Sequence, residues 1–309
     1  MTRVVFILGC TAVGKGAVGR AVARRAGGQI VSVDSMKVYR RMDVGTAKPS
    51  PEVRAAIPHH CLDLVEPSEG FSVAQYVVAA DAAIATIAAA GAVPLAVGGT
   101  SLYIKALSEG LFEGPSADVA LREELKRRAA TEGLAVLHAE LAAVDAEAAA
   151  RIHPNDERRI IRALEVHQAT GTPLSALQRQ WDSGQRRYDC VFVGLRRAKD
   201  DLNRRVNTRV KHMVADGLEQ ETAALLAEPA GLSVQAAAAV GYAEMIAYLG
   251  GQATREQAIE RIKINTRRLA KKQRTWYRRW PEVQWFDLAE DADAEATAEE
   301  ILRRVEIGL

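Results

Sequence analysis

The sequence has few cysteines: Cys10, Cys61 and Cys190 are the three in a chain of 309 residues. Their odd number and wide separation disfavour a disulfide framework, which needs paired cysteines, and a structural zinc site, which needs closely spaced ones. Free thiols are typical of reducing compartments. We therefore expect a cytoplasmic protein that uses neither disulfides nor structural zinc.

Long hydrophobic runs are missing as well. The longest mostly apolar stretch, residues 82–97, is interrupted by Gly91 and Pro94 and is too short to cross a bilayer. The first apolar run, residues 4–8, leads directly into a glycine turn, which is not the pattern of a secretory signal. The sequence therefore predicts neither a membrane span nor a leader.

An excess of one charge sign is the third absence, because 41 Lys and Arg stand against 39 Asp and Glu, a formal net charge of +2. The total hides an uneven distribution. Residues 261–279 hold nine Lys or Arg and no Asp or Glu, and residues 281–300 hold eight Asp or Glu and no Lys or Arg. A basic segment of this density is typical of contact with nucleic-acid phosphates. Pairing between the two segments is the alternative.

Short apolar segments alternate with helical patterns along most of the chain. This order predicts right-handed βαβ crossovers and a mostly parallel sheet, whose ligand site lies at the carboxyl ends of the strands. The expected fold class is α/β, with a core of the phosphate-loop nucleotide-binding type. Strands are expected at residues 3–8, 29–33, 93–97, 189–195 and 283–286, and helices at 15–25, at 73–90 and from about 200, 241 and 254.

The strand pattern stops between residues 117 and 185. This stretch is rich in Ala, Leu, Glu and Arg and is punctuated by Gly133, by a His-Pro-Asn turn at 153–155 and by a Gly-Thr-Pro turn at 171–173. We interpret residues 117–185 as an all-helical insertion domain in a core formed by residues 1–116 and 186–309.

A glycine-rich loop follows the first predicted strand. Residues 9–15 match the first seven positions of the phosphate-loop pattern GxxxxGK[ST], between a strand and a helix. Backbone N–H groups and the helix N-terminus would hold phosphate oxygens, and Lys15 would neutralise their charge. The residues expected to bind phosphate are Gly9, Cys10, Thr11, Ala12, Val13, Gly14, Lys15 and Gly16.

The eighth position of this loop is Gly16, which lacks the hydroxyl that usually ligates Mg²⁺. Three outcomes are open: water fills the ligand position, an oxygen of Thr100 or Asp34 fills it, or activity is reduced.

Residues 34–49, DSMKVYRRMDVGTAKP, resemble the DSxQxYxGMDIGTAKP signature of the tRNA dimethylallyltransferases. Shorter matches follow in family order, so the resemblance covers nearly the whole chain. They include residues 59–63, 98–103, 153–165, 205–218, 241–242 and 266–276.

The resemblance implies transfer of the dimethylallyl group of dimethylallyl diphosphate to N6 of adenosine 37, next to the tRNA anticodon, with release of diphosphate. It implies Mg²⁺ as cofactor, and we expect a monomer. Asp34 is then the base that removes a proton from the exocyclic amine. Lys15, the loop amides, Thr100 and Arg209 would meet the charge of the leaving diphosphate.

The resemblance also implies that the helical insertion and the stretch around residue 241 hold the anticodon stem-loop. The target adenine would leave its stack to reach the base. The residues expected to contact tRNA are Asp34, Ser35, Met36, Lys37, Thr100, Arg158, Arg159, Arg162, Gly241, Tyr242, Arg267, Lys271 and Lys272.

Four positions depart from the family pattern: Gly16, Lys37 in place of Gln, Arg41 in place of Gly, and Ser101 in place of Gly or Met. Lysine only donates hydrogen bonds, so Lys37 cannot supply the acceptor that Gln offers to an adenine. Two other functions remain open: a small-molecule kinase with a phosphate loop, and a tRNA-binding homologue with weakened catalysis.

Some site residues have a second interpretation. Thr100 could cap the next helix, and Arg209 could belong to a solvated helix face. His59, His60 and Asp63 could form a metal cluster, although a structural or substrate-wall role is favoured because adjacent histidines point apart.

Overall fold

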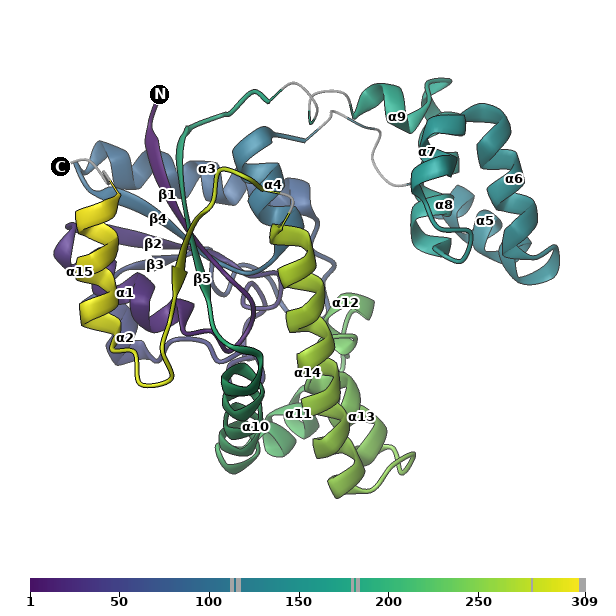
Figure 1. The fold of residues 1–309 in the computed structure, drawn as a ribbon. Helices are drawn as coiled ribbons and strands as arrows, with labels where there is room; N and C mark the ends of the chain where they lie inside the picture. The colour runs from purple at the N-terminus through teal and green to yellow at the C-terminus, as the bar shows by residue number, and fades with distance from the viewer. Residues whose placement is uncertain (112–113, 115–117, 179–180, 182–183, 279, 306–309) are drawn as a thin grey trace. The chain divides into compact units, whose positions relative to one another are not determined.

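The computed structural model describes residues 1–111, 114, 118–178, 181, 184–278 and 280–305 (Figure 1). The chain divides into two compact units, Met1–Ser108 with Arg187–Leu309, and Glu109–Arg186. The corresponding boundaries predicted from the sequence fall after residues 116 and 185. In the part of the chain that the structure describes, no helix is both long and apolar enough to span a membrane.

The first unit is built on a six-stranded parallel sheet with the order β3-β2-β4-β1-β5-β6. The predicted α/β class is thereby confirmed. A strand at His59–His60 was not predicted, because two residues are too few to show an alternating pattern. The strands are β1 (Arg3–Leu8), β2 (Gly28–Val33), β3 (His59–His60), β4 (Val93–Gly98), β5 (Asp189–Arg196) and β6 (Gln284–Asp287).

Helices cover both faces of this sheet (Figure 1). Successive side chains of β1 point to opposite faces, so Val5 and Ile7 pack with α1 and α15, whereas Phe6 stacks on Phe192. On the face that α3 covers, the Tyr76 hydroxyl donates to the carbonyl oxygen of Ser32 at 3.1 Å. These helices are α1 (Lys15–Arg25), α2 (Pro51–Ala56), α3 (Val73–Ala89), α4 (Ser101–Glu109) and α15 (Ala294–Arg304).

A group of helices between β5 and β6 packs against the long segment that follows β2. Val38, Tyr39 and Met42 of that segment are buried in one apolar cluster with residues of these helices. The longest helix, α14, begins at a capping box formed by Thr254 and Gln257 and carries most of the basic segment. The group comprises α10 (Lys199–Ala215), α11 (Leu218–Leu226), α12 (Val234–Ala237), α13 (Tyr242–Leu249) and α14 (Arg255–Tyr277).

The second unit is helical in its described residues and has its own apolar core, in which Leu137, Leu141 and Ile160 are fully buried. It also buries a carboxylate. Glu165 accepts hydrogen bonds from the guanidinium groups of Arg122 and Arg162, which compensate its charge. The helices are α5 (Val119–Thr131), α6 (Leu134–Val144), α7 (Ala146–Arg151), α8 (Glu157–Thr170) and α9 (Leu174–Leu177).

Candidate functional site at the carboxyl ends of the strands

A cleft of about 1300 Å³ opens at the carboxyl ends of β1, β2 and β4. This is where a parallel sheet places its ligands, because the loops leaving neighbouring strands meet at that edge. The phosphate loop, the residues after β2 and β4, and side chains from α10 and α14 line it. All of these residues belong to the first unit.

The phosphate loop has the backbone that its pattern predicts. Ala12 and Gly14 take positive φ values of 64° and 113°, and a Cβ on Gly9 would lie only 2.6 Å from the carbonyl oxygen of Leu195. Cys10 and Val13 are buried in the core beneath the loop, whereas Thr11, Ala12, Gly14, Lys15 and Gly16 line the cleft.

Lys15 is the cation of this loop. Its Nζ donates to the carbonyl oxygen of Cys10 at 2.8 Å, and burial lowers the pKa of its ammonium to about 8. The nearby charge of Arg209 lowers this pKa further, and that of Asp34 raises it. An anion that binds beside a desolvated ammonium of this kind stabilises its charged form.

Two helices hold the phosphate loop from outside. On α10, the Arg205 Nε donates to the carbonyl oxygen of Ala12 at 2.9 Å. On α14, Gln273 accepts the N–H of Thr11 at 2.8 Å and donates to the carbonyl oxygen of Gly99 at 2.8 Å. The helix α14, which carries most of the basic segment, is therefore hydrogen-bonded to the phosphate loop. Neither Arg205 nor Gln273 was predicted as a site residue, since both partners are backbone atoms far away in sequence.

Asp34 and Thr100 follow neighbouring strands and meet at the cleft. The Oδ1 of Asp34 accepts the N–H of Met36 at 2.9 Å and of Lys37 at 3.4 Å, while Oδ2 has no hydrogen-bond donor among the residues that the structure describes. The Thr100 hydroxyl oxygen accepts the N–H of Ser35 at 3.0 Å, so it holds the segment that carries Asp34.

Arg209 extends from α10 into the same cleft. Its guanidinium donates to the carbonyl oxygen of Thr46 at 3.4 Å, and its pKa is lowered by burial. The structure thus brings Lys15, Asp34, Thr100 and Arg209 together from four separate segments, and Arg209 does not lie on a solvated face.

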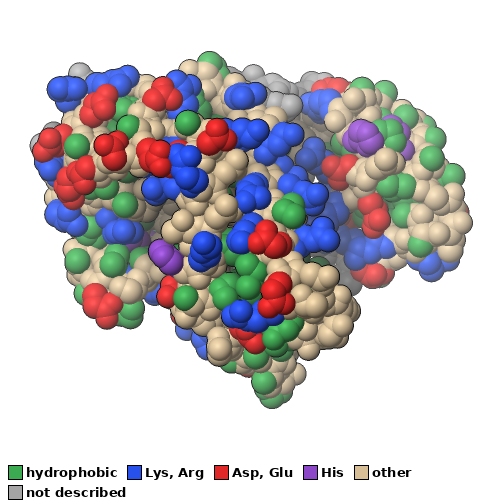
Figure 2. All heavy atoms as spheres, turned by 60° about the horizontal axis from the view of Figure 1, so that its bottom comes forward, with side chains coloured by type: hydrophobic (Ala, Val, Ile, Leu, Met, Phe, Trp, Pro, Cys, Tyr) green, Lys and Arg blue, Asp and Glu red, His purple; other side chains and the backbone are tan. Residues whose placement is uncertain are grey.

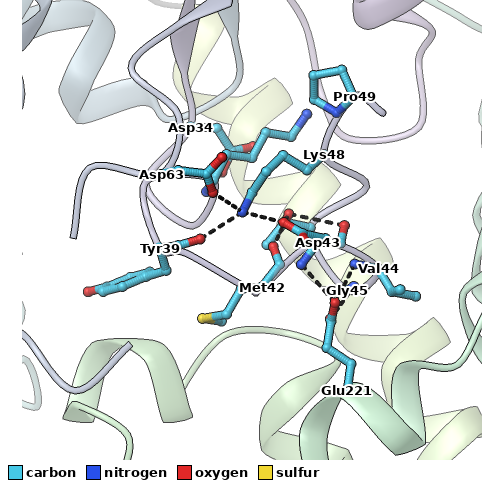
Figure 3. A network of polar contacts seen from close by, with 12 residues as sticks. Asp34, Tyr39, Met42, Asp43, Val44, Gly45, Lys48, Pro49, Asp63 and Glu221 are labelled. Carbon is cyan, nitrogen blue, oxygen red and sulfur yellow. Dashed lines mark hydrogen bonds and ion pairs between the residues drawn. The ribbon is translucent and has the colours of Figure 1, made fainter. Parts of the chain in front are cut away.

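Figure 3 shows how the segment after Asp34 is held around a buried lysine. The side chain of Lys48 is 0% exposed, and its Nζ contacts carboxylate oxygens of Asp63 at 2.7 Å and Asp43 at 2.5 Å and the carbonyl oxygen of Tyr39 at 2.7 Å. Burial alone would raise the pKa of Asp63, but hydrogen bonds from Lys48 and Arg54 outweigh it and lower that pKa. The last residues of the DSMKVYRRMDVGTAKP motif therefore stabilise its loop.

Glu221 of α11 holds the same loop from the other side (Figure 3). Its carboxylate accepts the N–H groups of Asp43, Val44 and Gly45 at 2.8, 2.8 and 3.2 Å, and also the hydroxyl of Tyr242 at 2.6 Å. Sequence reasoning missed Glu221, because no local pattern distinguishes it from surface glutamates.

Tyr242, which was expected to contact tRNA, is one of the residues around the cleft. Its side chain is 0% exposed and packs against Gly45, where an added Cβ would come within 2.4 Å of the ring. Its hydroxyl holds the carboxylate that binds the loop, and a contact of Tyr242 with tRNA stays a prediction. Gly241 precedes it at a positive φ of 104°, with its N–H bound to Glu244.

Of the predicted tRNA-contacting cations, Lys37 lines the cleft after β2, and the others lie on α14 and α8. Lys271 and Lys272 are exposed, and Lys272 lines the cleft. Arg267 is partly buried and donates to Asn207 of α10. On α8 of the second unit, Arg158 and Arg159 are exposed, whereas Arg162 is directed to Glu165.

In the ion pairs that the structure describes, the acidic segment pairs with parts of the chain other than the basic segment. Figure 2 shows many Lys and Arg side chains near the middle of the face in view and a group of Asp and Glu toward one edge. The described partners of the acidic residues come from α1, β5, α10 and α15. The pairs are Glu295 with Arg24 and Arg25, Glu299 with Arg25, Asp287 with Arg196, Glu290 with Arg204, and Glu300 with Arg304.

The sequence was compared with protein families and with known proteins. A profile of the family described as "IPP transferase" matches residues 37–280. The chain belongs to this family. It is 45% identical over 296 residues to a protein of Geobacter sulfurreducens named tRNA dimethylallyltransferase, covering 96% of this chain and 95% of that protein. It is 46% identical to one of the same name from Anaeromyxobacter dehalogenans, covering 98% and 100%.

Solved structures of similar proteins share the fold. The tRNA isopentenylpyrophosphate transferase of Bacillus halodurans aligns with a TM-score of 0.72 at 40% identity, covering 98% of this chain and 95% of that one. A eukaryotic dimethylallyltransferase acting on tRNA aligns with a TM-score of 0.81 at 26% identity, covering 97% and 78%. The resemblance inferred from the sequence motifs is confirmed.

Some departures of this IPP transferase from its family pattern have structural explanations. Arg41, which replaces a glycine, takes a φ of 59°, in the left-handed region that favours glycine. Its guanidinium pairs with Glu66 and Glu228.

His59 and His60 contact Ile57 and Gln29, and in the described residues no group of three or more His, Cys, Asp or Glu could hold a metal ion. The metal-cluster interpretation is wrong within that part of the chain.

The pKa of Lys15 leads to a pH dependence. Below pH about 8 its ammonium is charged and attracts a diphosphate, and above it the neutral amine does not. We expect the affinity for inorganic pyrophosphate, measured by calorimetry, to fall as the pH rises through about 8. Lys15→Met should lose roughly tenfold to hundredfold in affinity and show only the pH dependence of the ligand itself. An unchanged pH profile in this variant would contradict the assignment.

Tyr242→Phe tests whether this residue positions the loop. Loss of the hydrogen bond to the partly buried carboxylate of Glu221 should lower the free energy of unfolding by about 1.5–3 kcal/mol. The slope of log Kd for tRNA against log salt should not change, because the number of neutralised phosphates stays the same. Tyr248→Phe is the matched control, since its hydroxyl donates to Glu219 on the same pair of helices at a more exposed position. Weaker tRNA binding at unchanged stability would instead assign Tyr242 to RNA binding.

Proposed function

We propose that this protein transfers the dimethylallyl group of dimethylallyl diphosphate to N6 of adenosine 37 in tRNA and releases diphosphate. The observation that carries the proposal is that Asp34 and Lys15 line one cleft, in a chain 45% identical to a relative named tRNA dimethylallyltransferase. A carboxylate and a phosphate-binding loop are the two groups that this alkyl transfer needs.

The phosphate loop is assigned to the diphosphate of the donor. As the bond between C1 of the dimethylallyl group and the diphosphate oxygen breaks, negative charge grows on the leaving group. Fixed cations and N–H donors in a partly desolvated cleft stabilise such charge without reorganising. Lys15, the loop amides and Arg209 are the groups in position. Thr100 acts as a positioning residue, because its hydroxyl accepts the N–H of Ser35.

Asp34 is assigned as the base. N6 of adenine is a weak nucleophile, and it forms the new C–N bond as the C–O bond of the donor breaks. The amine then carries an extra proton, which must leave. Oδ1 of Asp34 is fixed by the two N–H groups of the turn, and Oδ2 is open to accept this proton.

The resemblance implies Mg²⁺, so the fit of position 16 to this ion matters. Mg²⁺ takes oxygen ligands and in phosphate sites is held by one or two protein oxygens together with substrate phosphates and water. Gly16 offers no side-chain oxygen, and a Cβ built there would face a nitrogen of Arg20 at 3.3 Å. Position 16 therefore supplies no ligand to the metal, and the steps above are assigned to protein groups alone.

For the nucleic acid, we propose that the exposed cations of α14 and α8 contact phosphates of the anticodon stem-loop. Lys272 lines the cleft, so an RNA that follows this side chain is led to the carboxylate of Asp34. Adenosine 37 lies in a loop, where leaving the stack costs least. We also propose a cytoplasmic location from the number and spacing of the cysteines, since no disulfide joins Cys10, Cys61 or Cys190.

The transfer assay tests the function. Unmodified tRNA and dimethylallyl diphosphate are incubated with the protein, and digested RNA is analysed by mass spectrometry for prenylated adenosine. Asp34→Asn keeps the acceptor for the turn N–H groups but loses the base, so the rate should fall roughly 10²- to 10⁴-fold at unchanged tRNA affinity. Asp216→Asn makes the same chemical change at an exposed position and is the control.

Other outcomes of the assay identify the alternatives. Wild-type protein that binds tRNA without product would support a tRNA-binding homologue, and consumption of a nucleoside triphosphate would support a kinase. A large loss of tRNA affinity in Asp34→Asn would make Asp34 a binding group.

The basic helix leads to a prediction about salt dependence. Replacing both Lys271 and Lys272 by Ala should lower the slope of log Kd against log salt by about 1 for each phosphate that is no longer neutralised. Affinity for inorganic pyrophosphate should not change. The control, Arg303→Gln with Arg304→Gln on α15, removes the same charge from a different helix. Equal slopes for the two double variants would show that general charge, and not binding through α14, attracts the tRNA.

A further inference from the structure

Arg20 of α1 is a cation that the proposed reaction leaves without a role. It is partly buried and lines the cleft one helical turn after Gly16. Among the residues that the structure describes, none forms a hydrogen bond or ion pair with its guanidinium. Arg24 and Arg25 on the same helix differ, since both pair with Glu295.

The position of this guanidinium relates it to the phosphate loop. A Cβ built on Gly16 would lie 3.3 Å from a terminal nitrogen of Arg20. The guanidinium therefore lies where the side chain of a Ser or Thr at the eighth loop position would begin. In other phosphate loops that hydroxyl holds Mg²⁺ next to the phosphates. A guanidinium at this place repels a metal cation and offers several N–H donors to phosphate oxygens.

A second cation lies close enough to Arg20 for their charges to interact. Lys37 lines the cleft, and its side chain likewise has no hydrogen-bond or ion-pair partner in the described part of the chain. Burial lowers the pKa of Lys37, and the charges of Arg209 and Arg20 lower it further, while that of Asp34 raises it. Cations that repel one another in a partly desolvated cleft are stabilised when an anion enters.

We propose that Arg20 binds the diphosphate of the donor and supplies the charge neutralisation that Mg²⁺ supplies at the eighth position of other phosphate loops. Lys37 stands beside it and adds positive charge to the same subsite. Gly16 and Arg20 thus act together: the missing side chain leaves the space open, and the guanidinium lies beside it. The proposal rests on the assignment of the cleft to a diphosphate, and it adds a binding residue and a reduced need for metal.

Binding of inorganic pyrophosphate without metal is the first test. Calorimetry in EDTA should show that Arg20→Gln binds roughly tenfold to hundredfold more weakly than wild type, the effect of one charge-assisted hydrogen bond. Arg24→Gln, one turn further along α1, should bind as wild type does. Because Arg20 pairs with no residue that the structure describes, Arg20→Gln should not lower the melting temperature, and a lower one would indicate a structural role. Equal affinity of Arg20→Gln and wild type in EDTA would overturn the proposal.

The double variant Gly16→Ser with Arg20→Gln restores the usual hydroxyl and removes the guanidinium. Its pyrophosphate affinity should be weak in EDTA and should rise about tenfold or more with Mg²⁺, whereas wild type should change by about threefold or less. A strong Mg²⁺ requirement in the wild type, equal to that of the double variant, would also overturn the proposal. Neither measurement needs tRNA, so failure of the transfer assay and failure of this subsite can be told apart.

A separate test distinguishes whether Arg20 binds the diphosphate of the donor or a phosphate of the tRNA backbone. If Arg20 contacts the tRNA backbone, Arg20→Gln will lower the salt slope of tRNA binding and leave pyrophosphate affinity unchanged. That result would contradict the diphosphate assignment. The expected result is the reverse, with weaker pyrophosphate binding and the same salt slope as wild type.

Discussion

The gathering of like charges in one partly desolvated cleft is the constraint on which the rest of the structure depends. Lys15, Arg20, Lys37 and Arg209 all line this cleft, and burial lowers the pKa of each. Cations held in this way repel one another and are poorly hydrated, so the folded chain must hold them in place. The same arrangement favours a ligand with several negative charges.

The scaffold meets this requirement through hydrogen bonds to backbone atoms. Gln273 connects α14 to Thr11 and Gly99, and Arg205 connects α10 to Ala12. Glu221 receives three consecutive N–H groups of the segment after Asp34. Each of these hydrogen bonds joins a helix side chain to a main-chain group, so the helices hold the loops of the site directly. The helices α10 and α14 are thereby connected directly to the phosphate loop.

This chain departs from the family pattern at position 16 of the phosphate loop. Replacement of the loop hydroxyl by Gly16 removes a metal ligand, and the guanidinium of Arg20 lies at the space that results. A change that looks like a loss in the sequence is, in the folded molecule, accompanied by a cation beside the same position. Lys37 increases the positive charge on the same side of Asp34.

Strand periodicity and local motifs were enough to predict the parallel sheet, the phosphate loop and the presence of Asp34 and Thr100 at strand ends. These features depend on neighbouring residues, so the sequence by itself determined them. It did not reveal β3, which is too short for a pattern, or Glu221, whose partners lie about 180 residues away in the chain. Only the tertiary structure decided that Tyr242 is buried, that Arg20 lies beside Gly16 and that the described ion-pair partners of the acidic segment lie outside α14. The physical reason is that burial and charge compensation are set by what packs against a residue, and those neighbours come from distant parts of the chain.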